Sequence, residues 1–140
     1  MVLEAIKHLE MEDDLHVWLG VYLDGNQTTN DRQIKQMWDV IDKYDVSHFA
    51  GVIVGNEVLF SKYMSLSELG DIVSSFRSNL TAKGIHIPVS TADLGDAWTT
   101  GLAQDSDIVM ANVHPFFAGR TAEQAPGWVS QQHHNSTSIY

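Results

Sequence analysis

The sequence predicts an α/β fold with about four parallel strands and intervening helices. Short apolar runs rich in β-branched residues alternate with longer segments whose apolar residues recur every three or four positions, as in repeated βα units. The clearest run, residues 49–54, is followed by Gly55 and then by Asn56 and Glu57. Such a run suits a strand buried on both faces. An open doubly wound sheet and part of a (β/α)8 barrel both satisfy this pattern.

The N-terminal third is expected to form a helix, a strand and a second helix. Residues 2–11 have apolar side chains at helical spacing, and residues 17–23 form an apolar run typical of a buried strand. The polar segment 26–30 is expected to be a loop. Thr28 or Asn30 would then cap the N-terminus of the helix that follows.

The next helix has the clearest boundaries. Ser65 and Glu68 match a capping box, in which each side chain accepts a hydrogen bond from the other residue's backbone N–H. Gly84 stands where a left-handed C-cap would end the helix. Between them, one apolar face keeps helical spacing through Leu69, Ile72, Val73, Phe76 and Leu80.

Two further strands and a short helix are expected after it. The third strand should begin to pair at Pro88 or Val89, because a proline cannot donate to a sheet ladder. Residues 96–104 predict a short helix, and residues 108–113 predict a fourth strand. The tail from Ala118 is polar and rich in Gln and Ser, so we expect a loop there.

The chain is acidic. Its 140 residues include 18 Asp and Glu against eight Lys and Arg, for a net charge of −10. Proteins that bind nucleic acids or anionic membranes present a basic face to them. The acidic balance of this chain therefore argues against either partner and suits a neutral substrate. No apolar run approaches the length of a membrane span, and the N-terminus lacks a signal-peptide pattern.

No cofactor and no metal are expected. A glycine-rich phosphate loop follows none of the predicted strands, so nucleotide binding has no support. The absence of cysteine excludes disulfides and thiolate chemistry. His133 and His134 are adjacent, yet no carboxylate accompanies them at ligand spacing, so a solvated tail is the simpler interpretation.

Three sequons make Asn26, Asn79 and Asn135 candidate glycosylation sites. With 20 Ser and Thr among 140 residues and six Asn, about one such match is expected by chance. The excess favours a secreted protein.

Four segments carry a family resemblance. They are residues 18–25, the Val-Gly-Asn-Glu motif at 54–57, the Val-Ser-Thr-Ala-Asp strand at 89–93 and the Ala-Asn-Val-His-Pro-Phe-Phe segment at 111–117. In this order they resemble glycoside hydrolase family 17, most closely its fungal cell-wall β-1,3-glucanases and glucan transglucosylases. The similarity runs from about residue 3 to residue 117.

The resemblance implies a partial (β/α)8 TIM barrel that holds the third to sixth strands and begins within the second helix. Residues 1–120 would form the partial glycoside hydrolase domain. Residues 121–140 would form a polar loop or tail of the same domain, with one amphipathic hint at Trp128. A full barrel needs about 250 residues. Four strands cut from a barrel leave two open edges, so we expect self-association unless a partner or the chain's own helices cover them.

The resemblance also implies retaining hydrolysis or transfer on β-1,3-glucan or its oligosaccharides. Such enzymes use one carboxylic acid to protonate the leaving oxygen and a second carboxylate, about 5–5.5 Å away, as nucleophile. By resemblance Glu57 is the general acid/base, and Asn56 binds the sugar hydroxyl beside the reacting carbon. The other substrate-binding candidates, for which packing or capping is the alternative, are Tyr22, Asp24, Asp93, Asn112, His114, Phe116 and Phe117.

The family's nucleophile motif, a Glu followed by Thr or Ser, Gly and Trp-Pro, does not occur in these 140 residues. Only eight residues separate Glu123 from His114, too few for a parallel crossover, so Glu123 is rejected as nucleophile. We therefore expect a fragment that is inactive alone, located outside the cell or in the cell wall. A non-catalytic glucan-binding half-barrel is the alternative, and a small enzyme that recruits Asp24 or Asp93 is a third.

Overall fold

The computed structural model describes residues 2–11 and 15–137, with side chains as far as residue 132. The strands are β1 (Val17–Val21), β2 (Phe49–Asn56), β3 (Val89–Leu94) and β4 (Met110–Asn112). The helices are α1 (Val2–His8), α2 (Gln27–Lys43), α3 (Leu66–Ala82), α4 (Thr100–Asp105) and α5 (Ala125–Thr137). Two 3-10 turns, η1 (Val46–His48) and η2 (Gly95–Ala97), precede β2 and follow β3.

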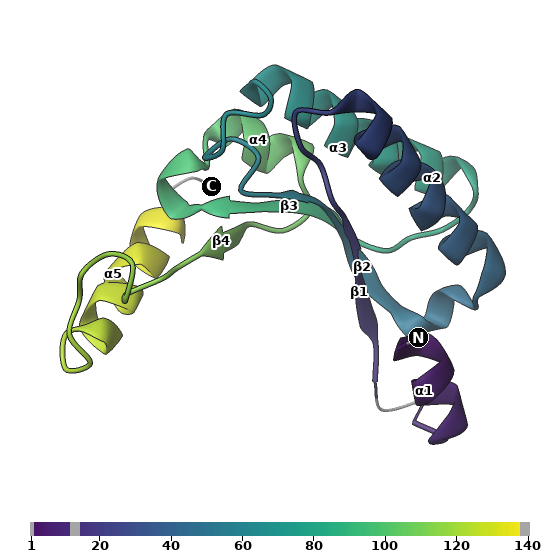
Figure 1. The fold of residues 1–140 in the computed structure, drawn as a ribbon, viewed down its shortest axis with the longest axis horizontal. Coiled ribbons are helices and arrows are strands. Elements are labelled where there is room, and N and C mark those ends of the chain that lie inside the picture. The colour runs from purple at the N-terminus through teal and green to yellow at the C-terminus, as the bar shows by residue number, and fades with distance from the viewer. Residues whose placement is uncertain (1, 12–14, 138–140) are drawn as a thin grey trace.

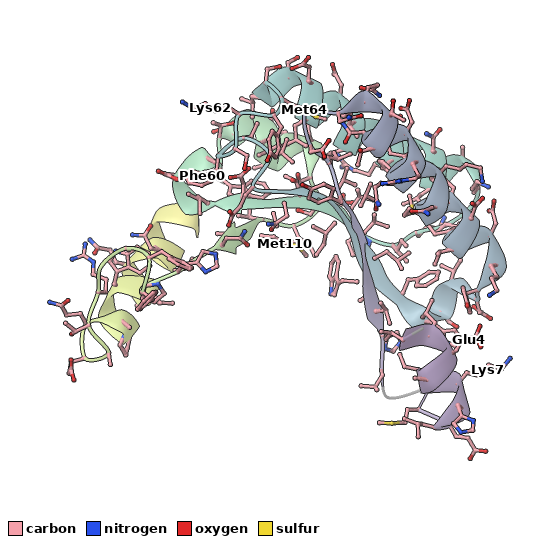
Figure 2. The ribbon with its side chains drawn as sticks, viewed as in Figure 1. Glu4, Lys7, Phe60, Lys62, Met64 and Met110 are labelled. Atoms are coloured by element: carbon pink, nitrogen blue, oxygen red, sulfur yellow. The ribbon has the colours of Figure 1, made fainter. Side chains whose placement is uncertain are left out.

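The strands form one parallel sheet in the order β1-β2-β3-β4. Figure 1 shows that the sheet is strongly curved, with α2, α3 and α4 over its outer face and α1 and α5 at its two ends. In the described part of the chain no helix covers the opposite, concave face, from which the Met110 side chain projects (Figure 2). The predicted α/β fold, four parallel strands with intervening helices, is confirmed.

The core lies between the sheet and the helices of its outer face. Val52 and Val54 of β2 are fully buried against a helical face that includes Leu69 and Val73 of α3. Side chains alternate along a strand, so β2 directs Val52 and Val54 to the helices and Ile53 to the concave side. Burial of each such aliphatic side chain contributes about 1.5–3 kcal/mol, which fixes the register of β2 and the direction in which its C-terminal end points.

The start of α2 differs from the prediction. Its N-cap is Asn26, whose Oδ1 accepts a hydrogen bond from the backbone N–H of Thr29 at 3.2 Å. The segment expected to be a loop is thus the cap and first turn of the helix, and the predicted caps Thr28 and Asn30 are wrong. Asn30 is buried instead, where its amide exchanges two hydrogen bonds with the backbone of Asp24.

The boundaries of α3 are as predicted. Ser65 Oγ accepts from the backbone N–H of Glu68 at 3.3 Å, and Glu68 Oε2 accepts from the backbone N–H of Ser65 at 2.8 Å. The carboxylate also accepts from the Ser65 hydroxyl, and these hydrogen bonds lower the pKa of Glu68. Gly84 follows the helix at a positive φ of 73°, as its place in the sequence predicts.

The C-terminal half differs from the prediction in two places. The third strand starts at Val89 as predicted, but the segment expected to be a single short helix divides into η2 and α4, with Thr99 as the N-cap of α4. The tail expected to be a loop forms the helix α5 over most of its length. Because α5 packs against η2, tertiary contacts stabilise a helix that its polar composition does not predict.

Gly51 supports a close approach on the concave face of the sheet. A Cβ atom there would lie 2.6 Å from the carbonyl oxygen of Pro88 and would collide with the ring of Trp18. We expect Gly51→Ala to lower the free energy of unfolding by about 1–3 kcal/mol, since the Pro88 oxygen belongs to the backbone and cannot move away without disturbing the adjacent strand. Gly20→Ala is the matched control in the same sheet, because no heavy atom lies within 4 Å of its Cβ position. Urea unfolding of both variants checks this, and equal losses would contradict it.

Candidate active site

A sharp turn at the end of β2 positions Glu57. Gly55 and Glu57 both have positive φ angles, 78° and 55°. A side chain at Gly55 would place its Cβ 2.6 Å from the Val58 side chain, so only glycine fits. Glu57 has no such freedom, and a left-handed conformation costs an ordinary residue about 1–2 kcal/mol. Its backbone N–H donates to the carbonyl of Ala92 at 2.7 Å, which holds the turn in place. Strain of this kind at a polar side chain suggests a functional role.

The Glu57 carboxylate is held by two residues from β4 and the loop after it. The Asn112 amide donates one hydrogen bond to Glu57 Oε1 at 2.8 Å and another to Asn56 Oδ1 at 3.0 Å. His114 Nε2 lies 3.4 Å from the same Glu57 oxygen. The Glu57 side chain is 26% exposed, so it is oriented yet reachable. Four predicted site residues, Asn56, Glu57, Asn112 and His114, thus meet at one point.

Glu57 opens into a cavity of about 620 Å³ between the strand ends and α5. This volume lies within the range of small-molecule sites, and aromatic rings on several sides give it flat apolar walls. The lining combines two acidic residues with polar, apolar and aromatic side chains: Glu57, Phe60, Leu94, Gly95, Asp96, Asn112, His114, Phe117, Ala118, Trp128 and Gln132. A polar group aimed into such a cavity suits a ligand with both ring faces and hydroxyls, as a sugar has.

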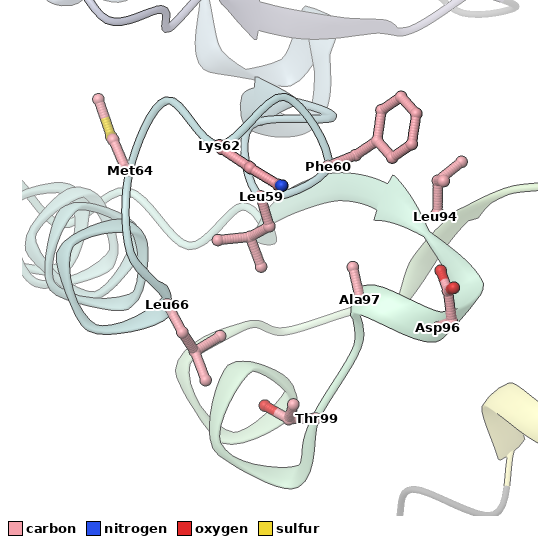
Figure 3. A pocket seen from close by; sticks show the side chains of 9 residues that line it. All are labelled: Leu59, Phe60, Lys62, Met64, Leu66, Leu94, Asp96, Ala97 and Thr99. Carbon is pink, nitrogen blue, oxygen red and sulfur yellow. The ribbon is translucent and has the colours of Figure 1, made fainter.

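A second groove of about 520 Å³ adjoins this cavity and shares Phe60, Leu94 and Asp96 with it. Figure 3 shows this groove between the loop after β2 and the segment that runs through η2, with Leu59 and Leu66 along it and Lys62 at its rim. The three shared residues place the groove next to the Glu57 cavity, along the outer loops.

Tyr22 and Asp24 lie away from the cavity. Tyr22 is half exposed and lines a separate concavity of about 540 Å³ on the concave face of the sheet, which Asn56 and Asn112 also border. Asp24 Oδ1 accepts the backbone N–H of Asn26 at 2.7 Å, a loop-capping role. Sugar binding by either residue stays a prediction, and neither residue has a described contact with Glu57.

Asp93 is a buried anchor of the loop that follows Glu57. It is fully buried, and its two oxygens accept backbone N–H groups, Leu59 at 2.9 Å and Leu94 at 2.8 Å. This geometry does not support the predicted sugar contact or a recruited catalytic role, since both oxygens are occupied inside the protein. The signal was available in the sequence: Asp93 shares the alternation of Val89, whose side chain faces the core.

The two phenylalanines after β4 differ in whether they line the cavity. Phe117 lines the Glu57 cavity and meets the His114 ring edge-on, at 5.8 Å between centroids. Phe116 packs edge-on against Phe117 at 5.5 Å but does not line the cavity. Both are more than four-fifths exposed. Phe117 is therefore the better placed of the two for contact with a ligand.

The sequence did not mark several cavity residues as site residues, among them Phe60, Asp96 and Trp128. Phe60 follows β2 and Asp96 lies in η2 after β3, where no periodicity marks either of them. Trp128 belongs to α5 and was noted only as an amphipathic hint. The sequence did contain a signal for Trp128, because a large aromatic residue in an otherwise polar segment indicates packing against another part of the protein or a ligand.

The other candidates occupy the surface. Asn26 caps α2, and Asn79 is exposed on α3. Asn135 lies in α5, and its side chain is outside the described part. Glu123 is exposed in the loop before α5, and hydrogen bonds from its own backbone and from the Thr121 side chain lower its pKa.

Metal ligation and membrane crossing have no structural counterpart in the described residues. No group of three His, Asp or Glu side chains lies where it could hold a metal ion among residues 2–11 and 15–132. Among the described helices, none is long and apolar enough to cross a membrane.

Comparison with known proteins identifies the family. The family model "BtgE/BtgC glycoside hydrolase domain" matches residues 1–140. A glucan endo-1,3-beta-glucosidase, btgC, of Emericella nidulans is 44% identical over 133 residues, which cover 91% of this chain and 20% of that protein. A "probable glucan endo-1,3-beta-glucosidase btgC" of Aspergillus flavus is 47% identical over 137 residues, 91% of this chain and 19% of that protein. The chain thus spans about a fifth of the length of these relatives.

Solved structures confirm the barrel-like arrangement. The crystal structure of a glycoside hydrolase family 17 β-1,3-glucanosyltransferase from Rhizomucor miehei superposes with a TM-score of 0.85 at 23% identity. The match covers 99% of this chain and 49% of that one, so the fold corresponds to about half of the neighbour. An active-site mutant of the same enzyme, in complex with laminaritriose, matches equally well. The chain belongs to the BtgE/BtgC glycoside hydrolase domain family, as its resemblance to glycoside hydrolase family 17 predicts.

Proposed function

We propose that this chain carries the general acid/base half of a β-1,3-glucan-cleaving or glucan-transferring site, with Glu57 as the acid/base. The observation that carries the proposal is the network at the end of β2, where Asn112 and His114 hold Glu57 at the wall of an aromatic-lined cavity. The names of the relatives, a glucan endo-1,3-beta-glucosidase and a β-1,3-glucanosyltransferase, support β-1,3-glucan as the substrate class.

In this proposal the two carboxylate oxygens of Glu57 have different tasks. Oε1 is engaged by Asn112 and faces His114, which fixes the rotation of the carboxyl group. Oε2 then carries the proton that is delivered to the leaving oxygen and later accepts one from water or from an acceptor sugar. Asn112 also donates a hydrogen bond to Asn56 Oδ1. This contact leaves the Asn56 amide nitrogen available to donate to a sugar hydroxyl.

The nucleophile is proposed not to be among these 140 residues. Retaining chemistry needs a second carboxylate about 5–5.5 Å from the first. Of the described residues that line the cavity, Asp96 is the other carboxylate, and it lies on the exposed turn η2 without the packing that holds Glu57. Asp93 is occupied by backbone N–H groups, and Asp24 caps a loop. We therefore propose that the chain does not turn over glucan by itself.

Glucan binding without catalysis is the second candidate function. The specific observation in its favour is the aromatic lining, in which Phe60, Phe117 and Trp128 offer ring surfaces to a sugar. Binding of this kind needs no nucleophile. The two functions differ in what happens to a bound oligosaccharide when a second carboxylate is supplied to replace the missing nucleophile. A binding module leaves the oligosaccharide unchanged, whereas the catalytic half-site cleaves or transfers it.

The contribution of Phe117 tests the proposed sugar site. We expect Phe117→Ala to weaken the binding of laminaritriose by roughly 2- to 12-fold, because an aromatic contact contributes about 0.5–1.5 kcal/mol beyond its area. Calorimetric titration measures the dissociation constant. Phe116→Ala is the matched control, as its ring neighbours Phe117 but does not line the cavity. An equal loss in both variants, or no binding by the unmodified chain, would remove the proposed site.

Location, domain boundaries and association are parts of the same proposal. A glucan-directed protein with three sequons suits an extracellular or cell-wall location. Residues 1–120 and 121–140 are proposed to form one domain, because α5 packs on η2 and supplies Trp128 to the cavity. The outer strands β1 and β4 each have one neighbour in this sheet, so we propose self-association through those edges.

A further inference from the structure

A small groove lies between α2 and α3 on the outer face of the fold. It holds about 250 Å³ and is lined by residues of both helices, among them Trp38 and Ser75. Trp38 stacks in parallel on Phe76, with ring centroids 5.4 Å apart and an angle of 8° between the planes. Phe76 is buried, whereas Trp38 is partly exposed, with the Lys83 ammonium over its ring at 5.7 Å from the centroid. The part of the Trp38 ring that Phe76 and Lys83 leave uncovered is the aromatic surface of the groove.

Asn79 stands at the edge of this groove, at the first position of a sequon. Its side chain is exposed and is one of the groove's lining residues. Its amide nitrogen Nδ2 points toward Ser75 Oγ, at 3.4 Å, and Ser75 lines the groove too. A sugar that replaces the other hydrogen of Nδ2 keeps this contact and starts at the rim of the groove that Asn79 itself lines.

The size of the groove favours a tethered occupant. Pockets for free small molecules usually hold about 300–1,000 Å³, and this one is smaller. A group attached covalently at the rim needs little intrinsic affinity, because its effective concentration at the groove is of the order of millimolar. We propose that Asn79 carries an N-linked glycan whose first sugar residue packs in the α2–α3 groove against Trp38.

The modification is a group transfer from a lipid-linked oligosaccharide diphosphate, the donor class of the secretory pathway. Asn79 Nδ2 attacks the anomeric carbon of the first N-acetylglucosamine and loses one proton. The bond from that carbon to the phosphate oxygen breaks, and the lipid diphosphate leaves with the electron pair. The Thr81 hydroxyl completes the acceptor sequence, as the sequon requires. One N–H remains on Asn79 Nδ2, so its hydrogen bond to Ser75 survives the modification.

The location is compatible with the proposed glucan site. Helix α3 runs antiparallel to the strands, so its last turn lies at the end of the sheet opposite to Glu57. A glycan on Asn79 would cover the outer helical layer without entering the Glu57 cavity, which residues of the strand ends and α5 line. The inference does not depend on the catalytic proposal.

Asn26 supplies a comparison within the same chain. It also begins a sequon and is exposed, but its Oδ1 serves as the N-cap of α2 and it does not line the α2–α3 groove. A glycan there would start outside that groove. A comparison of the two sites therefore distinguishes the effect of attaching a glycan from the effect of packing its first sugar in the groove.

The experiment secretes the 140-residue chain from a eukaryotic host and measures intact mass before and after digestion with an amidase that releases N-glycans. Asn79→Gln and Thr81→Ala should each remove the same glycan mass, because either change destroys the sequon. Thermal unfolding of the glycosylated chain should occur about 2–6 °C above that of the Asn79→Gln variant. The same two chains made in bacteria give the intrinsic effect of the substitution, which is subtracted. Asn26→Gln also removes the N-cap of α2, so its effect in the bacterial chains is subtracted in the same way. The remaining contribution of the Asn26 glycan to the midpoint should be less than about 1 °C.

Two results would overturn the inference. The first is a secreted chain in which Asn79 carries no glycan, whether or not Asn26 does. The second is an occupied Asn79 whose glycan shifts the unfolding midpoint no more than the glycan on Asn26, since a seated sugar must stabilise the fold it packs on. Both Asn79→Gln and Thr81→Ala replace exposed side chains, so folding of the variants is expected.

Discussion

The 140-residue chain is expected to leave laminarin uncleaved and untransferred at mildly acidic to neutral pH. Glu57 supplies a proton, but without a nucleophile no covalent glycosyl intermediate forms, and loss of a covalent nucleophile costs about 10⁶-fold in turnover in well-studied hydrolases. Release of reducing ends and chromatography of oligosaccharide products measure the two reactions. The expected rate equals that of Glu57→Gln, the isosteric control without a transferable proton.

A measurable rate that Glu57→Gln abolishes would contradict this expectation. The chain would then hold a second functional carboxylate, and Asp96 would be the residue to replace next, because it lines the same cavity as Glu57. Asp96→Asn would be compared with Asp71→Asn, an exposed carboxylate on the outer face of α3. Only the first should lower such a rate.

Asp93→Leu, near the end of β3, is expected to lower the free energy of unfolding by roughly 2–5 kcal/mol, the largest effect on stability that we expect from a single substitution. The substitution fits an apolar residue into a buried position but leaves the backbone N–H groups of Leu59 and Leu94 without acceptors. Each buried donor left unpaired costs about 1–3 kcal/mol. Urea unfolding at an unchanged m-value measures the loss.

Asp93→Asn is the graded companion of that variant. Its remaining carbonyl oxygen accepts one of the two N–H groups, so about half of the loss is expected. Asp96→Leu changes an exposed carboxylate three residues away and should alter stability by less than about 0.5 kcal/mol. An Asp93→Leu variant as stable as the unmodified chain would show that the buried carboxylate does not hold the Glu57 loop.

The parts of the fold that sequence predicts are those that local physics decides. The capping box of Ser65 and Glu68 needs only neighbours three residues apart, and it forms as predicted. The apolar run at residues 49–54 forms the strand β2 as predicted, but helices cover only one of its faces, and Ala50 and Ile53 are partly exposed. The four residues that meet at Glu57 follow from the family resemblance together with the rule that parallel strands align their C-terminal ends.

The errors arise where tertiary contacts choose between local alternatives. Asn26, Thr28 and Asn30 are all acceptable N-caps, and burial of Asn30 against Asp24 decides in favour of Asn26. Helix α5 has a polar sequence without a strong apolar face, so its contact with η2, not its pattern, makes it a helix. Asp93 shows that a carboxylate at a strand end can point into the core when backbone N–H groups there donate to both of its oxygens.

The cavity itself lay beyond prediction for a related reason. Its walls come from the loop after β2, the turn η2 and α5, which are distant in sequence and adjacent only in the fold. Sequence reasoning places residues at the ends of strands, whereas Phe60, Asp96 and Trp128 enter the site from loops and a helix. Such contributions become visible only when the chain is folded.

If the space around Glu57 binds β-1,3-glucan, laminaritriose should perturb the residues that line it, which a ¹H–¹⁵N NMR titration of the chain measures residue by residue. The Glu57→Gln variant, which keeps the shape of the site, is titrated in parallel. The predicted result is a saturable set of shift changes in both proteins, confined to Asn56, Glu57 or its replacement, Phe60, Asn112, His114, Phe117, Trp128 and their neighbours. Shift changes centred on another surface, or none at millimolar laminaritriose, would contradict glucan binding around Glu57.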